Sequence, residues 1–200
     1  MLILIKKKSY CCALAVKLQL HLSNLKKKRL LPDTICKKKD LYLQKKTFLM
    51  TASSFKINLF LLVNLPSAFF CGVRTKYIDN QQCVVTVKHR WINQNPFKSM
   101  YFAVQAMAAE LSTGALVLIQ IKKVNKNISM LVANSKSNFT KKATGRITFT
   151  CNDGYLIEQA IATAIATNLG QTVWMKSVGI DQKGDQVSEF DFEWSVRVKV

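Results

Sequence analysis

Histidine is almost absent from this chain of 200 residues, which carries only His21 and His89. Its six cysteines include no Cys-x-x-Cys pair, so the usual zinc ligands do not occur at zinc-binding spacing. The chain also lacks a glycine-rich phosphate loop, a Ser-His-Asp order and a nucleophile elbow. These absences argue against a zinc enzyme, a phosphate-loop enzyme and a serine hydrolase.

The cysteines do not form a disulfide framework. Three lie in the first 49 residues, and the other three lie singly in apolar segments. Buried reduced thiols are typical of a cytoplasmic protein, which is the location that we expect. The apolar stretch 57–71 is interrupted by two asparagines and a proline and is too short to span a bilayer. We therefore expect no membrane span.

Acidic residues are scarce as well, with 11 Asp+Glu against 30 Lys+Arg and a net charge of +19. Residues 1–49 hold 13 Lys+Arg and two acids, whereas residues 50–200 hold 17 and nine. The longer part is therefore only moderately basic. Its excess charge favours either a ligand with phosphates, such as coenzyme A, or simple solubility.

The first 49 residues repeat lysine triplets, at 6–8, 26–28 and 37–39, between short Leu/Ile stretches without a sustained period. Three interpretations are open: a basic arm for nucleic acid, an amphipathic membrane-surface segment, or a translation of AT-rich sequence upstream of a true start. We favour the third and predict that the native protein starts at Met50. Residues 50–200 are then the folded domain, and no nucleic-acid partner is expected.

The segment 95–114 is the most informative part of the chain. Small and apolar residues fill it almost completely, with one carboxylate, Glu110, inside. Ser99 precedes the apolar run and is predicted to cap a helix that ends at Gly114. A helix that is apolar on nearly every side is buried, so Glu110 must be paired, protonated or functional.

Hydrophobic periodicity predicts the elements around this central helix. They are a helix at 55–63, strands at 72–78 and 83–90, then, after the central helix, strands at 115–124, 129–135 and 146–152, a helix at 155–168, and strands at 171–181 and 187–199. In the last strand, apolar and polar residues alternate, so one face is buried. One antiparallel sheet wrapped around a central helix, an α+β fold, satisfies this order.

The order of elements and the fifteen residues that separate Asn95 from Glu110 resemble the hotdog-fold thioesterases of the phenylacetic-acid type. Those enzymes carry an Asn, then Gly-Thr, then His-Gly-Gly, then an acid on the long central helix. Matched without a gap, Asn95 takes the Asn position, Ser99 the Thr position and Glu110 the acid position. The resemblance implies a hotdog fold with the antiparallel sheet wrapped around the long helix.

Residues 55–198 look more closely like an uncharacterised bacterial hotdog family, domain of unknown function 4442. The segments 90–96 and 107–111 carry most of that resemblance. The chain departs from the thioesterase pattern at the helix start, where Tyr101 stands in place of His and Phe102-Ala103 in place of Gly-Gly. Glycines there let a thioester carbonyl approach backbone N–H groups. The side chain of Phe102 either blocks that approach or reshapes the acyl pocket.

The resemblance implies an acyl-CoA thioesterase-like protein in which the carboxylate of Glu110 attacks a thioester or activates water, and Asn95 positions the water or the carbonyl. The expected substrate-binding residues are Ser99, Tyr101, Phe102, Lys141 and Lys142, the two lysines meeting coenzyme A phosphates. Neither a metal nor a cofactor is expected, since the coenzyme A thioester is the substrate. The alternative readings are a structural pairing of Glu110, a packed Tyr101 and a solvated lysine loop.

A second function class stays open, a non-catalytic hotdog module that binds an acyl or lipid-like ligand. In either class a single sheet leaves one edge strand open, and related hotdog proteins pair two sheets edge to edge. We therefore expect residues 50–200 to form a homodimer or a dimer of dimers.

Overall fold

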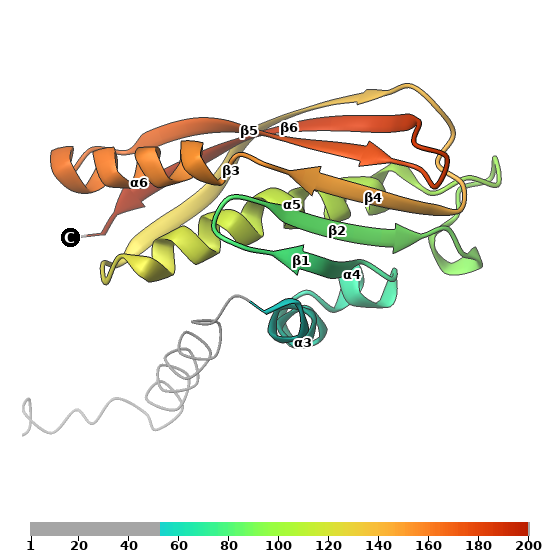
Figure 1. The fold of residues 1–200 in the computed structure, drawn as a ribbon, viewed down its shortest axis with the longest axis horizontal. Coiled ribbons are helices and arrows are strands. Elements are labelled where there is room, and N and C mark those ends of the chain that lie inside the picture. Colours follow the sequence, from blue (N-terminus) through green and yellow to red (C-terminus); the bar gives the residue numbers. More distant parts are fainter. Residues whose placement is uncertain (1–52, 200) are drawn as a thin grey trace, which may run out of the picture. The chain divides into compact units, whose positions relative to one another are not determined.

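The computed structural model describes residues 53–199. In chain order the elements are α3 (Ser54–Asn64), α4 (Pro66–Phe70), β1 (Arg74–Ile78), β2 (Cys83–Lys88), the short 3₁₀ helix η1 (Trp91–Asn93), α5 (Phe102–Lys123), β3 (Ile128–Phe139), β4 (Arg146–Cys151), α6 (Gly154–Thr167), β5 (Gln171–Ile180) and β6 (Gln186–Val198). Figure 1 shows their arrangement. The predictions for residues 1–49, and for a start at Met50, lie outside the described residues.

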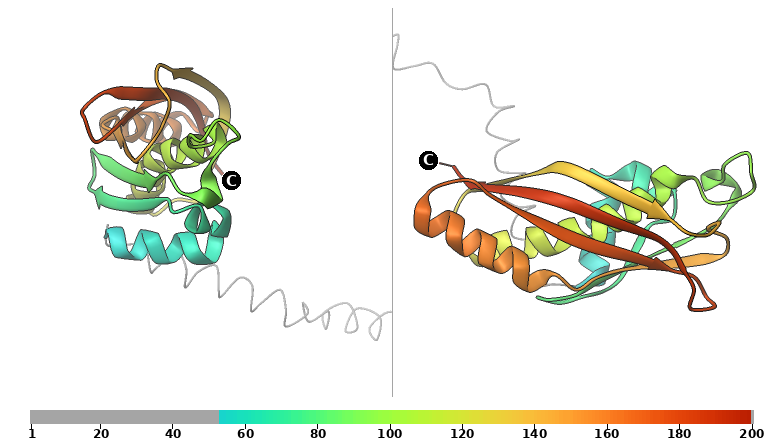
Figure 2. Two further views of the ribbon diagram at one scale, coloured as in Figure 1. Left: turned by 90° about the vertical axis from the view of Figure 1, so that its right-hand side faces the viewer. Right: turned by 90° about the horizontal axis from the view of Figure 1, so that it is seen from above.

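The strands form one antiparallel sheet in the order β1-β2-β4-β5-β6-β3. The sheet curves around α5, which runs along its inner face (Figures 1 and 2). Inward side chains of the central strands pack on α5, and the alternation predicted for the last strand is confirmed by the burial of Phe190, Phe192, Trp194 and Val196. The predicted α+β architecture, an antiparallel sheet around a central helix, is confirmed.

The start and the end predicted for the central helix are wrong. The residue that precedes the first turn of α5 is Tyr101, not Ser99, and the Ser99 hydroxyl instead donates to the side-chain oxygen of Asn95. Gly114 lies in the middle of α5. Residues 115–124, predicted as a strand, continue the helix to Lys123. Because this half of α5 is buried beneath the sheet, its apolar run needs no polar face.

Gly114 is explained by the close approach of Trp194 on β6. A Cβ atom at Gly114 would lie 3.1 Å from two ring atoms of Trp194. The ring is held in place because its Nε1–H donates to the Thr113 hydroxyl at 3.0 Å. The glycine therefore makes room for an indole against the helix rather than ending the helix.

The two edges of the sheet are covered differently. Along the β1 edge lies α3, whose Asn58 side chain donates to the Thr75 carbonyl at 3.0 Å and accepts from the Thr75 N–H at 2.8 Å. The opposite edge is β3, which is exposed over most of its twelve residues. Among the described residues, α5 is the one helix that is long and apolar enough to cross a membrane, and most of it is buried in the core.

Candidate functional site

A tight turn leads into α5, and Asn95 organises it. The Asn95 side-chain oxygen accepts hydrogen bonds from the N–H of Phe97 at 3.0 Å, and from the N–H and the hydroxyl of Ser99, both at 3.2 Å. Lys98 has a φ of 58°, in the left-handed region that lets the chain reverse there. The oxygen of Asn95 is thus engaged in the turn, and its amide N–H₂ group is what remains for a ligand.

Backbone bonds fix the turn against the rest of the fold. The Met100 N–H donates to the Ala143 carbonyl at 2.8 Å, and the Tyr101 N–H donates to the Asn93 carbonyl at 2.9 Å. Asn93 is buried, and its side chain donates to the carbonyls of Cys71 and Lys88, both at 2.9 Å. The start of α5 is therefore held by β2, α4 and the β3–β4 loop together.

A cavity of about 580 Å³ lies between this turn and the β3–β4 loop. Six of the seven residues predicted for the site line it, namely Asn95, Ser99, Tyr101, Phe102, Lys141 and Lys142. The seventh, Glu110, does not. The structure thus brings together the residues expected to bind substrate and leaves the expected catalytic carboxylate outside the cavity.

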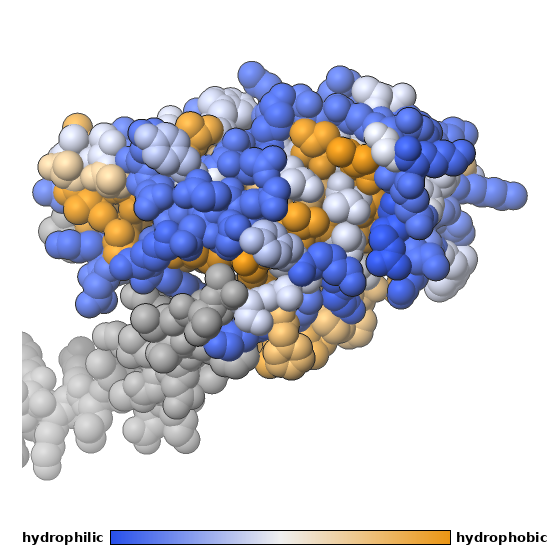
Figure 3. Space-filling view, viewed as in Figure 1, coloured by the Kyte–Doolittle hydropathy of each residue, from blue (hydrophilic) through white to orange (hydrophobic). Residues whose placement is uncertain are grey.

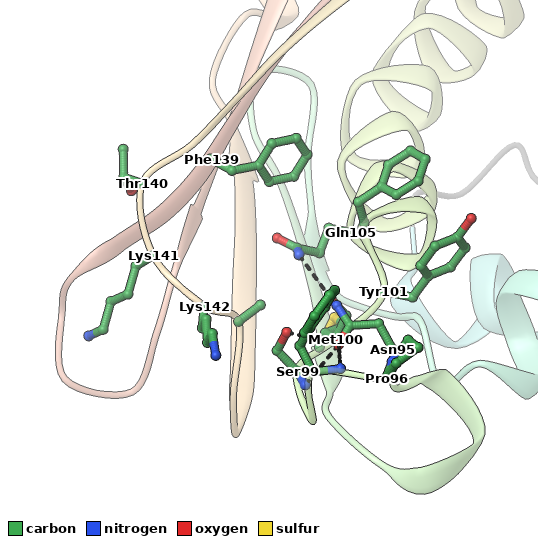
Figure 4. Close-up of a pocket in the computed structure, with 13 residues that line it drawn as sticks. Asn95, Pro96, Ser99, Met100, Tyr101, Gln105, Phe139, Thr140, Lys141 and Lys142 are labelled. Carbon is green, nitrogen blue, oxygen red and sulfur yellow. Dashed lines mark hydrogen bonds between the residues drawn. The ribbon is translucent and has the colours of Figure 1, made fainter.

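The cavity also has residues that sequence reasoning missed, chiefly Gln105 and Phe139. Figure 4 shows Gln105 extending from α5 and Phe139 from the end of β3, so that the two face each other. Gln105 is buried, and its side-chain oxygen accepts from the Ser188 hydroxyl at 2.9 Å. A polar side chain inside an apolar helix singled out Glu110, and the same signal would have found Gln105.

Unpaired backbone donors lie at the start of α5. The first turn begins with hydrogen bonds from the N–H groups of Val104 and Gln105 to the Tyr101 carbonyl. The N–H groups of Phe102 and Ala103 precede them and have no partner within the helix. These two N–H groups and the positive end of the helix dipole could stabilise an oxygen atom on which negative charge develops.

Glu110 lies further along the same helix, packed where Gly114 leaves space. Its Oε1 would lie 3.3 Å from a Cβ atom at Gly114, next to the Trp194 ring. Burial raises the pKa of its carboxyl above the usual range. Within residues 53–199, the carboxylate makes no hydrogen bond or ion pair with another side chain. The sequence predicts that Glu110 is paired, protonated or functional, and a paired state is not found within the described residues of one chain.

The carboxylate of Glu110 is too far from the unpaired N–H groups to act beside them in one chain. Glu110 follows Phe102 by eight residues, which is about 12 Å along a helix axis. A carbonyl bound at the N–H of Phe102 would therefore not be in contact with the carboxylate of the same chain.

The two lysines predicted to meet phosphates differ in their surroundings. Lys141 donates to Asp181 at 2.7 Å and to Asp185 at 2.5 Å, so its charge is already neutralised. Lys142 is exposed beside it (Figure 4). The hydrogen bond from Lys141 lowers the pKa of Asp181 to about 2. Lys142 is the better placed of the two for an anionic ligand.

The other groups with possible site chemistry are metal ligands and thiols. Residues 53–199 contain no group of three His, Cys, Asp or Glu side chains that could hold a metal ion. Cys83 and Cys151 face each other across β2 and β4, and both are buried. Burial raises the pKa of Cys83, and that of Cys151 to about 12, so neither thiol forms the reactive thiolate at neutral pH.

Solved structures of other proteins have the same fold. A protein of unknown function from Pseudomonas aeruginosa, described as a probable thioesterase, matches with a TM-score of 0.62 and 19% identity over 75% of this chain and 99% of its own. A putative thioesterase from Shewanella oneidensis matches with 0.60 and 12% identity, over 73% and 97%. The PaaI protein of the E. coli phenylacetic acid degradation operon matches with 0.50 and 12% identity, over 72% and 98%.

These identities are low, so the structural matches show the hotdog fold and no particular activity. A comparison with curated proteins finds no match. A family model, by contrast, matches residues 59–196, which is most of the described part. The chain has the hotdog fold and belongs to the family described as Domain of unknown function (DUF4442).

Proposed function

We propose that this protein hydrolyses acyl thioesters, with coenzyme A thioesters as the first substrates to examine and Glu110 as the catalytic carboxylate. The observation that carries the proposal is the state of Glu110, a carboxylate on the central helix with a raised pKa and no ionic partner within residues 53–199. Keeping such a group costs stability, which a protein tolerates where the group has a chemical task.

The start of α5 supplies the second part of the proposal. The N–H groups of Phe102 and Ala103 would bind the thioester oxygen and stabilise the negative charge that develops on it during attack. The free amide group of Asn95 would donate to the same oxygen or to the attacking water. The cavity beside them, with Phe139 and Gln105 on its walls, would hold the acyl group.

Because about 12 Å separate Phe102 from Glu110 along the helix axis, the proposed reaction needs the carboxylate of a second chain, and so a homodimer. Two chains paired along their β3 edges would bring two α5 helices side by side in opposite directions. The carboxylate of each helix would then approach the helix start of the other. The exposed β3 edge supports this arrangement, since an uncovered edge strand is the usual site of sheet extension.

The reaction then has two possible first steps. Glu110 either removes a proton from water, whose oxygen attacks the carbonyl carbon, or attacks that carbon itself to form an acyl anhydride that water cleaves. In both, the carbon–sulfur bond breaks, the thiolate leaves and takes up a proton, and the acid is released. The raised pKa of Glu110 strengthens it as a base near neutral pH.

The test is the hydrolysis of a panel of acyl-CoA thioesters by the full chain, by Glu110→Gln and by Glu158→Gln. The first substitution removes the charge with little change in shape, and the second removes an exposed glutamate on α6 as the matched control. We expect Glu110→Gln to lower kcat about a hundredfold or more and Glu158→Gln to leave it unchanged. Equal turnover by Glu110→Gln and the unmodified chain would remove Glu110 from the mechanism.

The alternative is a non-catalytic module that binds an acyl or lipid-like ligand. Phe102 favours it, because a phenyl ring stands where the thioesterase pattern has a glycine. The rings of Tyr101 and Phe102 pack edge to face, 4.9 Å apart, beside the cavity. No turnover on any chain length by a folded protein, together with a fatty acyl compound extracted from the purified chain, would favour this alternative.

A further inference from the structure

The loop that precedes α5 exposes large apolar side chains to solvent. The exposed fraction is 83% for Trp91, 56% for Ile92 and 75% for Phe97. The side chain of Asn93 ties this loop to Cys71, and Phe70 at the end of α4 is 64% exposed. We call these four residues, Phe70, Trp91, Ile92 and Phe97, the aromatic rim. Figure 3 shows further apolar surface over α3 and α4.

Cations surround the aromatic rim. Lys88, Arg90 and Lys98 are exposed in or beside the loop. Arg74 lies over the Phe69 ring, 3.7 Å from its centre. Burial, and then the charge of Arg90, lower the pKa of Arg74, so two guanidinium groups lie close enough to repel each other. Such a pair favours binding of an anion that neutralises both.

Carboxylates are missing from this part of the molecule. Between residues 53 and 109 the chain has a single acid, Asp79, at the turn between β1 and β2. Asp79 accepts from the Tyr77 hydroxyl and from the N–H groups of Gln81 and Gln82. The nearby acids Asp181 and Asp185 are engaged by Lys141. The cations at the aromatic rim therefore have no acidic partner in their own segment.

We propose that the aromatic rim docks on an anionic lipid bilayer, with Trp91, Ile92, Phe97 and Phe70 in the headgroup region and the surrounding cations on lipid phosphates. Exposed Trp and Phe flanked by Lys and Arg are the combination that binds such an interface. A double-stranded nucleic acid would use the cations but would leave the apolar side chains without a partner. This proposal does not depend on thioester hydrolysis. Phe97 also lines the cavity, so docking would bring the cavity to the membrane surface.

Tryptophan fluorescence of the full chain tests this docking at one residue. Trp194 is buried, and Trp174 lies on the outer face of the sheet, with the Lys136 ammonium 4.6 Å from its ring centre. Vesicles of phosphatidylcholine with about one third phosphatidylserine, brominated on the acyl chains, quench only tryptophans that enter the bilayer. We expect quenching with a blue shift, lost in Trp91→Phe and kept in Trp174→Phe. The lysine-rich residues 1–49 cannot produce this signal, because they contain no tryptophan.

Two further variants separate the apolar and the charged contributions. With Trp91 as the reporter, Ile92→Ser should raise the lipid concentration for half-maximal quenching severalfold, and Arg90→Glu with Lys98→Glu about tenfold or more. Lys123→Glu with Lys126→Glu is the matched charge control and should change little, because Lys123 is the last residue of α5, Lys126 follows the helix, and both are exposed.

Three results would overturn the proposal. The first is quenching that persists in Trp91→Phe, and the second is equal quenching by vesicles of phosphatidylcholine alone. The third is a Trp91 emission that is already blue-shifted without lipid and depends on protein concentration, since a second copy of the chain would then cover the aromatic rim. Lipid docking with no thioester turnover would leave this proposal intact and count only against the proposed hydrolysis.

Discussion

The two edges of the sheet are treated in opposite ways. At the β1 edge, the side-chain amide of Asn58 makes the same pair of hydrogen bonds to Thr75 that a neighbouring strand would make, and α3 covers the edge. At the other edge, β3 has twelve residues and no neighbour on its outer side within residues 53–199. This difference between the two edges supports the proposed pairing of two chains along β3, because an uncovered edge strand is the usual site of sheet extension.

The largest effect is expected from Ser137→Pro in β3. The Thr140 N–H donates to the Val187 carbonyl of β6. Along a strand, successive N–H groups point alternately to the two neighbouring sides. The N–H of Lys136, four residues earlier, therefore points toward β6, and that of Ser137 points toward the open edge. Proline at 137 therefore removes a donor needed only by a second chain. We expect light scattering to give a monomer mass for this variant in place of the proposed dimer, and thioester hydrolysis to fall about a hundredfold or more.

Lys136→Pro is the matched control for this experiment. It removes an N–H that faces β6, so it should destabilise the fold itself, with a lower midpoint of thermal unfolding. A Ser137→Pro protein that keeps both the dimer mass and full activity would show that the β3 edge is not the interface.

A substitution at the β1 edge should change the free energy of unfolding and leave the oligomeric state unchanged. Asn58→Ala leaves the N–H and the carbonyl of the buried Thr75 without their partner, and we expect a loss of about 2 kcal/mol in the free energy of unfolding. Chemical denaturation measures it. Val63→Ala is the control on the same helix, because the side chain of Val63 is largely exposed. Equal losses in the two variants would contradict a special role of Asn58 at the edge.

The dependence of stability on pH tests the surroundings of Glu110 on the β3 side of the sheet. Glu110 packs near Trp194 on β6, the strand beside β3. Because burial raises its pKa, the folded state holds the proton more tightly than the unfolded state. Stability is then highest below the usual carboxyl pKa and falls as the pH rises through the raised value. Glu110→Gln should therefore unfold at a higher temperature than the unmodified chain near pH 7, and at the same temperature below about pH 4.

Protein concentration sharpens this test. If pairing along β3 brings a hydrogen-bond donor to Glu110, the stabilisation by Glu110→Gln should shrink at concentrations where the dimer forms. If Glu110→Gln is less stable than the unmodified chain at pH 7 under conditions where both are monomers, Glu110 already has a favourable partner within its own chain.

The smallest effect is expected at Lys141, which ties the chain beyond β3 to Asp181 and Asp185. The pair is exposed, so Lys141→Ala should lower stability only slightly. Because the pKa of Asp181 is lowered to about 2, this contribution is present above the usual aspartate pKa and is lost as the pH falls toward 2. Thermal unfolding at low and moderate salt checks it. A large, salt-independent loss would indicate a different role for Lys141.

The sequence predicts the sheet well, because period-two alternation in β6 and the turn residues between strands are local signals. It fails for residues 115–124, where an apolar, β-branched run after a glycine reads as a strand. The reason for Gly114 is an indole eighty residues later in the chain, which no local pattern shows. The pairing of Lys141 was likewise hidden, because Asp181 and Asp185 lie 40 and 44 residues away.

The sequence indicates which residues gather at the helix start, but not the distances between them. The family pattern groups Asn95, Ser99 and Tyr101 there, and all three line the cavity because they are close in sequence. Their roles in a reaction stay predictions. The same pattern places Glu110 on the predicted helix, eight residues after Phe102, but does not show that Glu110 lies outside the cavity. The surroundings of Glu110 and of the cavity depend on Trp194 of β6 and on the β3–β4 loop, which are far from the helix in sequence.

The amide of Asn58 would also limit how large the proposed assembly can grow. A sheet with one free edge can be extended once, and two such sheets joined by a two-fold axis leave no edge for a third. A sheet with two free edges has no such limit and can add copies in both directions, as fibrils do. By occupying the backbone of Thr75, Asn58 would make the proposed pairing along β3 self-terminating.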